Sequence, residues 1–475
     1  MEVISKSALD QLWHDADARD ELLRRVVEER LAERPAPRLE DAVVATYFFA
    51  LRTQSLEELA SEIAYHSTSG IRKPPPNSLL SACTGWPAGV ETFDATGRLG
   101  LLHMAYPLKM LLPEDGHLTS TDLLHTCASA IIFDVYENQD ARLVGLQIPE
   151  AVVRTFPGPA YGPKGVRAVT KFPQDAPAFG TILKPTAGIT PEDVGRLVGD
   201  AAACDLFAFV KEDENLYPNL PYSPVAERTR RAMAAIEAAR SQRGGRGLLF
   251  APHITAAPHE IMDWARAAVD AGAHALMFSE SFVGGAVRMV REAFRHLERP
   301  PAIYGHNAGI GVRSRVVWRE VIDYLARLDG IDFRQTAPVK PGMPFLKPYG
   351  AEWEASERVL SMEIPGIRPT MIARAGGLDQ GNIGLNLADT EARGIAEGVL
   401  FLAGSAINSI KNKYGKADVK LGVESMQQAL AVYRSGELRG VGVEEHLRAL
   451  IAVADGKGLQ ALREALRQRY PREAA

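Results

Sequence analysis

Cysteine is scarce in this 475-residue chain, which contains only Cys83, Cys127 and Cys204. Because the three are widely spaced and odd in number, they indicate neither a disulfide framework nor a zinc site. The net charge of −5 leaves no basic footprint, so we expect no nucleic acid partner. No apolar run approaches the roughly 18 residues of a membrane span, and the first residues lack a signal-peptide pattern. These absences predict a cytoplasmic protein that does not span a membrane.

The composition, with 46% hydrophobic and 24% charged residues, is that of a soluble globular protein with a substantial core. A chain of this length is too long for one ordinary domain. Apolar residues recur at helical spacing up to the Pro35-Ala-Pro37 stretch, which ends that segment. We therefore expect a helical N-terminal extension (1–37), a smaller α+β domain (38–155) and a larger domain with C-terminal helices (156–475).

The smaller domain begins with an apolar strand expected at 42–51. A helix is expected next at 55–65, because Ser55 and Glu58 stand at the two positions of a capping box. Another strand is expected at 101–107. Strand, helix and strand in this order predict an antiparallel sheet and an α+β, ferredoxin-like domain.

Strands and helices alternate in the larger domain. Strand-like runs are found at 179–184, 206–211, 247–252, 274–279, 301–305, 331–335, 369–374 and 398–403. Eight βα units over roughly 250 residues are typical of a (β/α)₈ TIM barrel. A doubly wound open sheet is the alternative. Polar residues at the C-terminal ends of nearly all these runs favour the barrel, because a barrel active site is built there.

One run ends abruptly in charge: the uncharged apolar residues 206–210 are followed by Lys211-Glu-Asp-Glu-Asn215. Side chains alternate along a strand, so Lys211 and Asp213 share a face, and Glu214 can reach the same point from the loop. Carboxylate oxygens that converge there suit a hard cation such as Mg²⁺. If CO₂ carbamylates Lys211, that side chain becomes a third anionic oxygen ligand. A surface salt-bridge cluster is the alternative interpretation.

Two motifs in order resemble the RuBisCO large-chain superfamily. The first, Gly180-Thr-Ile-Leu-Lys-Pro185, ends one barrel strand, and the second, Lys211-Glu-Asp-Glu214, ends the next. The resemblance extends from about residue 40 to about residue 430. It implies that Lys184 is a catalytic lysine, for which a structural salt bridge is the alternative interpretation. It also implies that carbamylated Lys211 holds Mg²⁺ together with Asp213 and Glu214.

The sequence departs from the family's carboxylases at three places. Thr186 stands where they have a second lysine, and Asn307 stands where they have a phosphate-binding arginine. The loop at 336–349 is rich in proline, which makes it stiffer than the mobile lid of a carboxylase. Lys340 is the best match to the lysine of that lid, with Lys347 as the alternative. These departures indicate a RuBisCO-like protein (form IV type) that does not fix CO₂.

Other residues match family positions near the substrate. His306 matches a histidine beside the substrate and is expected to support catalysis. Asp134 stands where the family has an asparagine that contacts substrate and metal. His253 is a second candidate for substrate contact, although a lone histidine is more often structural. Arg334 suits two phosphate oxygens, and an ion pair at the rim is its alternative.

Two glycine-rich turns complete the expected substrate pocket. Gly376-Gly377 and Gly404-Ser405 match the family loops that present backbone N–H groups to phosphate. Small residues let a phosphate approach the backbone. Because Ala375 replaces a family serine and the second loop has lost glycines, one phosphate site is expected and a second is eroded.

The resemblance implies an enzyme that forms an enediolate from a phosphorylated keto-sugar or keto-sugar acid. Enolisation, isomerisation and decarboxylation all pass through that intermediate. Lys184 is the leading proton carrier, and His306 and Lys340 support it. The resemblance also implies a homodimer in which the N-terminal domain of one subunit, with His66 near a family glutamate position, completes the partner's barrel mouth. A true carboxylase and a non-catalytic scaffold are the alternative readings.

Overall fold

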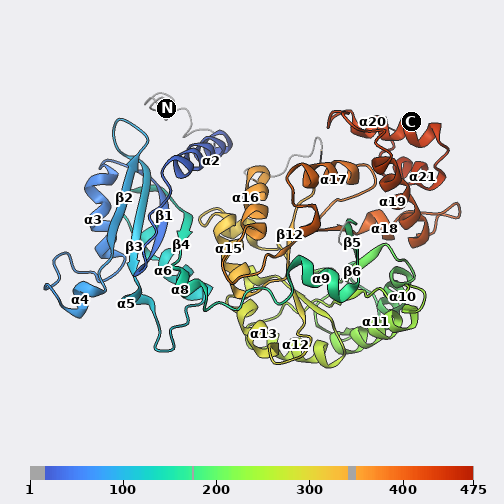
Figure 1. Cartoon of the computed structure of the whole chain (residues 1–475), viewed down its shortest axis with the longest axis horizontal. Coiled ribbons are helices and arrows are strands. Elements are labelled where there is room, and N and C mark those ends of the chain that lie inside the picture. The colour runs from blue at the N-terminus through green and yellow to red at the C-terminus, as the bar shows by residue number, and fades with distance from the viewer. Residues whose placement is uncertain (1–15, 174–175, 341–348, 474–475) are drawn as a thin grey trace.

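The computed structural model describes residues 16–173, 176–340 and 349–473. Figure 1 shows an N-terminal sheet with its helices at one end, a barrel in the middle, and the C-terminal helices at the far end. Within the described residues, no helix has both the length and the apolar character to cross a bilayer. The division at residues 37 and 155 stays a prediction.

The N-terminal sheet is antiparallel, in the order β2-β3-β1-β4. Its strands are β1 (Ala42–Leu51), β2 (Trp86–Thr92), β3 (Leu99–Pro107) and β4 (Asn138–Gln147). The helices of this part are α2 (Ala16–Glu33), α3 (Leu56–His66), α4 (Leu79–Ala82), α5 (Leu108–Leu111), α6 (Ser120–Cys127), α7 (Ala130–Phe133) and α8 (Glu150–Val153). The α+β prediction is confirmed, and so is the capping box of Ser55 and Glu58.

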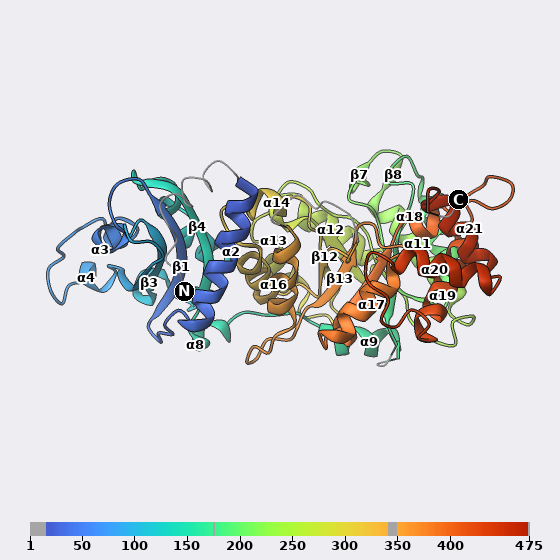
Figure 2. The same cartoon turned by 90° about the horizontal axis from the view of Figure 1, so that it is seen from above.

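Every residue of β1 is buried, because both faces of the sheet are covered. Helix α3 packs on the side away from the barrel, as Figures 1 and 2 show. The other side shares a hydrophobic core with Trp318, Val321 and Leu325 of the barrel's outer layer. A bridge between Leu143 and Val317 also links β4 to that layer. The sheet is thereby tied to the barrel of its own chain.

The larger sheet is parallel throughout, in the order β10-β11-β12-β13-β14-β5-β6-β9. A bridge between His253, just after β9, and Met277 of β10 closes the ring. This closure confirms the TIM barrel and excludes the open sheet. The strands lie within the expected runs or within one residue of them: β5 (Ala178–Ile182), β6 (Phe207–Lys211), β9 (Leu249–Ala251), β10 (Ala275–Phe278), β11 (Ala302–Gly305), β12 (Phe333–Thr336), β13 (Met371–Ala375) and β14 (Val399–Ala403).

Helices surround the barrel and form the C-terminal part of the chain. They are α9 (Gly162–Thr170), α10 (Pro191–Ala202), α11 (Val225–Ala239), α12 (Ile261–Asp270), α13 (Ala286–Phe294), α14 (Ile310–Arg313), α15 (Arg319–Asp329), α16 (Tyr349–Ser361), α17 (Ile383–Ala392), α18 (Ser405–Asn408), α19 (Val419–Arg434), α20 (His446–Gly456) and α21 (Gln460–Arg469). Two 3₁₀ turns (Glu280–Phe282 and Ala396–Gly398) and a small ribbon of β7 (Asn219–Leu220) with β8 (Ser223–Pro224) complete the fold.

Aromatic rings fill the barrel's interior. The Phe209 ring centroid lies 4.7 Å from that of Phe333 and 5.6 Å from that of Tyr304. Figure 2 separates the two ends of the barrel: the β7–β8 ribbon, α14 and α18, which follow strands, lie along the upper edge, and α9 lies along the lower. Because the interior is packed, chemistry is confined to the mouth at the carboxyl ends of the strands.

Candidate active site

The barrel mouth brings together side chains from several strands. Lys184 follows β5 by two residues, Lys211 is the last residue of β6, and His306 follows β11 directly. Parallel strands end at one edge, so residues far apart in sequence meet there. The structure thus brings Lys184, Lys211, Asp213, Glu214 and His306 into one site.

Lys211 is buried at the floor of this site. Its Nζ lies 3.2 Å from the carbonyl oxygen of Glu212 and 3.3 Å from the sulfur of Met277. It also lies 5.5 Å from the centroid of the Tyr304 ring. Burial lowers the pKa of Lys211 to about 8, against the pull of the neighbouring carboxylates. Roughly a tenth of the Lys211 side chains is therefore neutral at pH 7, and the neutral amine is the form that adds to CO₂.

Asp213 and Glu214 both lie near Lys211 and are held by different contacts. Asp213 Oδ2 accepts a hydrogen bond from Lys184 Nζ at 2.6 Å, while Oδ1 accepts from the backbone and side-chain nitrogens of Asn215. Glu214 Oε2 lies 3.3 Å from His306 Nε2. This hydrogen bond, opposed in part by burial, holds the pKa of Glu214 well below its usual range.

The tautomer of His306 follows from its two contacts. The backbone N–H of Ala308 donates to Nδ1 at 3.1 Å, so Nε2 carries the proton and donates to Glu214. Burial lowers the pKa of His306, although Glu214 opposes that shift. His306 is therefore neutral at physiological pH and presents an N–H toward the mouth.

The donor set fits a hard cation only with a third oxygen. Among the described residues, no group of three or more His, Cys, Asp and Glu side chains is placed to hold a metal. Asp213 and Glu214 supply carboxylate oxygens, and a carbamate on Lys211 would supply the third. Oxygen-only ligands are those that Mg²⁺ prefers. The residues present fit a carbamate-dependent Mg²⁺ site.

Glu212, inside the same run, has a structural role that the sequence reasoning did not assign. Its two carboxylate oxygens accept from Nε and NH2 of Arg228 at 2.7 and 2.9 Å, and both side chains are fully buried. Oε2 also accepts from the backbone N–H of His253 at 2.8 Å. Strand alternation was the available signal, because it points Glu212 away from Lys211 and Asp213.

His253 and Arg334 are engaged in the fold itself. Nδ1 of His253 lies 3.2 Å from the Leu216 carbonyl oxygen and Nε2 lies 2.6 Å from Thr255 Oγ1. Burial also lowers the pKa of His253 to about 3. The fully buried Arg334 pairs with Glu280 and Asp323.

These contacts favour the structural alternative for both residues. In His253 each ring nitrogen already has a partner, and in Arg334 the guanidinium lies between two carboxylates below the surface. The expected substrate contact of His253 and phosphate contact of Arg334 are therefore not supported by the geometry.

The glycine-rich turns lie beside the two lysines of the mouth. Gly376 and Gly377 have φ of +92° and +93°, a region that favours glycine. A Cβ on Gly377 would lie 1.5 Å from Lys340 Nζ, and a Cβ on Gly404 would lie 3.5 Å from Lys184 Cε. Lys340 is partly buried, and this burial lowers its pKa. Only a glycine at position 377 leaves room for Lys340 to approach the turn. Lys347, the alternative match to the lysine of the carboxylase lid, lies outside the described residues.

The C-terminal helix also reaches these turns, which sequence reasoning missed. Nε of Arg469 donates to Asp379 Oδ2 at 3.0 Å and its NH1 donates to Ser405 Oγ at 3.4 Å. The Tyr470 hydroxyl donates to Asp379 at 2.8 Å. Asp379 and Arg469 are 90 residues apart in sequence, and no local pattern pairs them.

The N-terminal candidates are not brought to the mouth of their own barrel. His66 ends α3, on the face of the sheet away from the barrel (Figure 1), and its side chain is 61% exposed. Asp134 is also exposed, just after α7. Within one chain, neither residue belongs to the site.

Parts of the chain are similar to known proteins. Residues 166–343 match the family model of the ribulose bisphosphate carboxylase large chain, catalytic domain. A ribulose bisphosphate carboxylase-like protein of uncharacterized function from Bordetella bronchiseptica is 28% identical over 330 residues, which are 66% of this chain and 72% of that protein. Residues 166–343 are therefore similar to the catalytic domain of the RuBisCO large chain.

Other proteins that are similar to this chain differ in their named activities. A 3-oxo-isoapionate-4-phosphate transcarboxylase/hydrolase from Xanthobacter autotrophicus is 29% identical over 240 residues, 49% of this chain and 54% of that protein. The octameric RuBisCO of Pyrococcus horikoshii has a similar structure, with a TM-score of 0.74 and 20% identity over 91% of this chain and 94% of that one. This likeness confirms the fold.

The structure shows the contacts of Asn307 and the burial of Thr186, two positions that depart from the RuBisCO carboxylases. Asn307 Oδ1 accepts a hydrogen bond from Gln335 Nε2 at 2.8 Å, and the Tyr304 hydroxyl donates to Gln335 Oε1 at 2.9 Å. Asn307 is thus tied to β12. Thr186 is partly buried beyond Lys184, and it adds no charge there.

Proposed function

We propose that the chain is a Mg²⁺-dependent RuBisCO-like enzyme that forms an enediolate from a phosphorylated keto-sugar or keto-sugar acid and does not fix CO₂. One observation carries the proposal: a buried lysine and two carboxylates share a site in which Lys184 is hydrogen-bonded to one of those carboxylates. The name of the Xanthobacter relative supports a phosphorylated 3-oxo sugar acid as the substrate class.

Carbamylated Lys211, Asp213 and Glu214 would hold the cation. When bound, it polarises the substrate carbonyl and stabilises the enediolate. Lys184, 27% exposed at its side chain, faces the mouth and would exchange a proton with the reacting carbon. His306 presents its Nε2–H toward the same point.

Two reactions share this intermediate. In enolisation, Lys184 as the neutral amine removes the proton on the carbon beside the carbonyl. In decarboxylation of a 3-oxo acid, the bond to the carboxylate breaks, CO₂ leaves, and the electron pair remains as the enediolate. The Lys184 ammonium then returns a proton to that carbon. The phosphate would lie against the N–H groups of Gly376 and Gly377, beside Lys340.

The experiment separates these reactions. Purified protein, equilibrated with MgCl₂ and bicarbonate, is given a phosphorylated 3-oxo sugar acid labelled with ¹³C at the carboxylate. Release of labelled CO₂ identifies decarboxylation. Exchange of the proton beside the carbonyl of a phosphorylated keto-sugar into D₂O identifies enolisation.

Control variants and the scaffold alternative complete the design. Lys184→Met should abolish both reactions, whereas Lys164→Met, on the exposed face of α9, should abolish neither. If wild-type protein binds Mg²⁺ and CO₂ but catalyses neither reaction on any phosphorylated keto compound, the proposed function is wrong. If it binds neither Mg²⁺ nor CO₂, the scaffold reading is favoured instead.

A further inference from the structure

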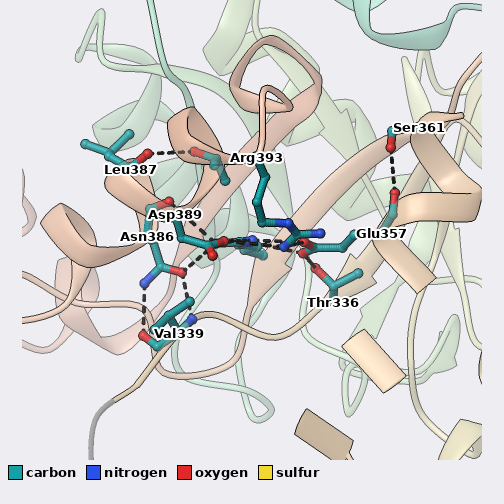
Figure 3. A network of polar contacts seen from close by, with 10 residues as sticks. Thr336, Val339, Glu357, Ser361, Asn386, Leu387, Asp389 and Arg393 are labelled. Atoms are coloured by element: carbon teal, nitrogen blue, oxygen red, sulfur yellow. Dashed lines mark hydrogen bonds and ion pairs between the residues drawn. The ribbon is translucent and has the colours of Figure 1, made fainter. Parts of the chain in front are cut away.

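The loop that carries Lys340 is attached at its base to helix α17. Val339, directly before Lys340, donates its backbone N–H to Asn386 Oδ1 at 2.8 Å. Its carbonyl oxygen accepts from Asn386 Nδ2 at 3.0 Å. This reciprocal pair resembles a step of a β-ladder in which a side-chain amide replaces the second strand (Figure 3).

The amide of Asn386 has partners in all four of its hydrogen-bonding directions. Besides the two bonds to Val339, Oδ1 accepts from NH1 of Arg374 at 3.2 Å, and Nδ2 donates to the carbonyl oxygen of Asn382 at 2.9 Å. An amide has two donors and two acceptor positions, so none is left over. Arg374 offers only donors, which fixes the oxygen of Asn386 on that side.

A partly buried charge network holds Asn386 on the side away from Val339. Arg374 donates to both carboxylate oxygens of Glu357, at 3.0 and 2.9 Å, and also pairs with Asp389. Arg393 pairs with the same two carboxylates. With two arginines and two carboxylates, the network carries no net charge, and Figure 3 shows it between α16 and α17.

The same network also holds the start of the loop. Thr336, the last residue of β12, donates its hydroxyl to Glu357 Oε1 at 3.0 Å. The chain is therefore attached at Thr336 and again at Val339, and Lys340 follows at once. Its Nζ lies against Gly377, where any Cβ would collide with it.

We propose that Asn386 is a positioning residue that holds Lys340 at the Gly376–Gly377 turn, so that α17 sets the place of this ammonium before substrate binds. The inference rests on the proposed function, which places the substrate's phosphate at that turn. Asparagine suits the role because alanine and leucine lack both of the groups that Val339 needs, and aspartate lacks the donor. Without the amide, the N–H and the carbonyl oxygen of Val339 lose these partners, so the base of the loop should shift.

The test is a double-mutant cycle on Asn386→Ala and Lys340→Ala. The first readout is the Kd of inorganic phosphate, and the second is kcat/KM with whichever phosphorylated keto compound the enzyme turns over. A third readout is deuterium uptake of the peptide that contains Val339. The matched control is Thr390→Val, also buried on α17, whose hydroxyl donates, among the described residues, to Leu387 of its own helix.

Asn386→Ala should weaken phosphate binding and lower kcat/KM by roughly tenfold to a hundredfold, the range for misplaced binding groups. It should also speed deuterium exchange at Val339. In the Lys340→Ala background, Asn386→Ala should cause no further change in the phosphate Kd or in kcat/KM. Thr390→Val should match wild type in all three readouts. Additive effects of the two alanine variants, or unchanged exchange at Val339, would overturn the proposal.

The measurements of phosphate binding test this inference separately from the proposed function on which it rests. If no phosphorylated keto compound is turned over, the proposed function fails. The cycle on the phosphate Kd still decides between positioning and independent roles. Full coupling there supports the inference and additivity rejects it.

Discussion

Nζ of Lys184 lies 2.6 Å from Oδ2 of Asp213, so the expected proton carrier and an expected metal ligand share one hydrogen bond. A cation held by Asp213, as the proposed function requires, would compete with Lys184 for the same oxygen and would repel its ammonium. Lys184 and the proposed metal site would therefore be coupled through Asp213.

The first prediction concerns Lys211, whose nitrogen is placed to become a carbamate. Lys211→Ala should abolish metal-dependent activity while the fold remains, and Lys211→Arg should do the same because a guanidinium does not form a carbamate. We expect a loss of at least about a hundredfold, the range for removing a main electrostatic group from an active site. Steady-state rates at saturating Mg²⁺ and bicarbonate measure it.

The matched control for this variant is Lys164→Arg, a conservative change at an exposed lysine of α9. Circular dichroism should show the same helix content in all variants. A Lys211→Ala protein with wild-type Mg²⁺ affinity and turnover would sink the carbamate hypothesis.

The second prediction is that the chain does not fix CO₂. Thr186 and Asn307 replace two cationic groups of the carboxylases, and Asn307 is tied to Gln335. Incubation with ribulose bisphosphate, Mg²⁺ and ¹⁴C-bicarbonate should therefore give no labelled 3-phosphoglycerate. A known carboxylase in the same assay is the positive control, and stoichiometric labelled product from this chain would reverse the conclusion.

Much of the barrel could be predicted from sequence because burial and chain direction leave a strong local pattern. Residues 206–210 are apolar on both faces, as a strand between core and helices must be, and the polarity changes where the strand meets solvent. The same pattern recurs at Lys184 and His306. The local pattern was therefore enough to place Lys211, Asp213 and Glu214 at the mouth, and the family resemblance added Lys184 and His306.

The contacts that sequence could not supply are those between distant elements. Whether Arg334 faces a phosphate or an ion pair depends on Asp323 and Glu280, and the pairing with Glu280 spans 54 positions. Arg469 meets Asp379 across 90 positions. No periodicity encodes such pairs, because they depend on how whole helices pack.

The third prediction concerns stability and pH at Glu352 of α16. Burial, with Glu320 nearby, raises the pKa of Glu352 to about 7, although Arg24 and Arg319 oppose the shift. In the unfolded chain the carboxyl titrates near its ordinary value of 4.5. Between these two pH values the folded state holds a proton that the unfolded state has lost. The contribution of Glu352 to the free energy of unfolding therefore falls as pH rises from about 4.5 to 7.

Glu352→Gln should remove this fall in the free energy of unfolding with rising pH. The difference in unfolding free energy between variant and wild type should grow by up to about 3 kcal/mol from pH 5 to pH 8, since one pKa unit corresponds to about 1.4 kcal/mol. Urea unfolding at equal protein concentration measures it. Glu354→Gln, on an exposed position of the same helix, is the control. A difference that does not change with pH would show that Glu352 is ionised in the fold at all these pH values.

The fourth prediction concerns assembly. Helix α3 with His66 lies on the side of its sheet that faces away from the barrel, and Asp134 is exposed (Figures 1 and 2). If these residues act in catalysis, they must act in the mouth of another subunit. A two-fold dimer uses the same patch twice and would create two such shared sites.

Subunit complementation tests this arrangement. A Lys211→Ala subunit is mixed with a subunit that carries both His66→Ala and Asp134→Ala, under conditions that allow exchange. Each mixed dimer then contains one site built wholly from wild-type residues and one site with all three changes. With random pairing, half of the dimers are mixed, so roughly a quarter of the wild-type activity should return. If mixed dimers form, as native mass spectrometry would show, and activity stays at zero, then the sites are not shared or His66 and Asp134 do not belong to them.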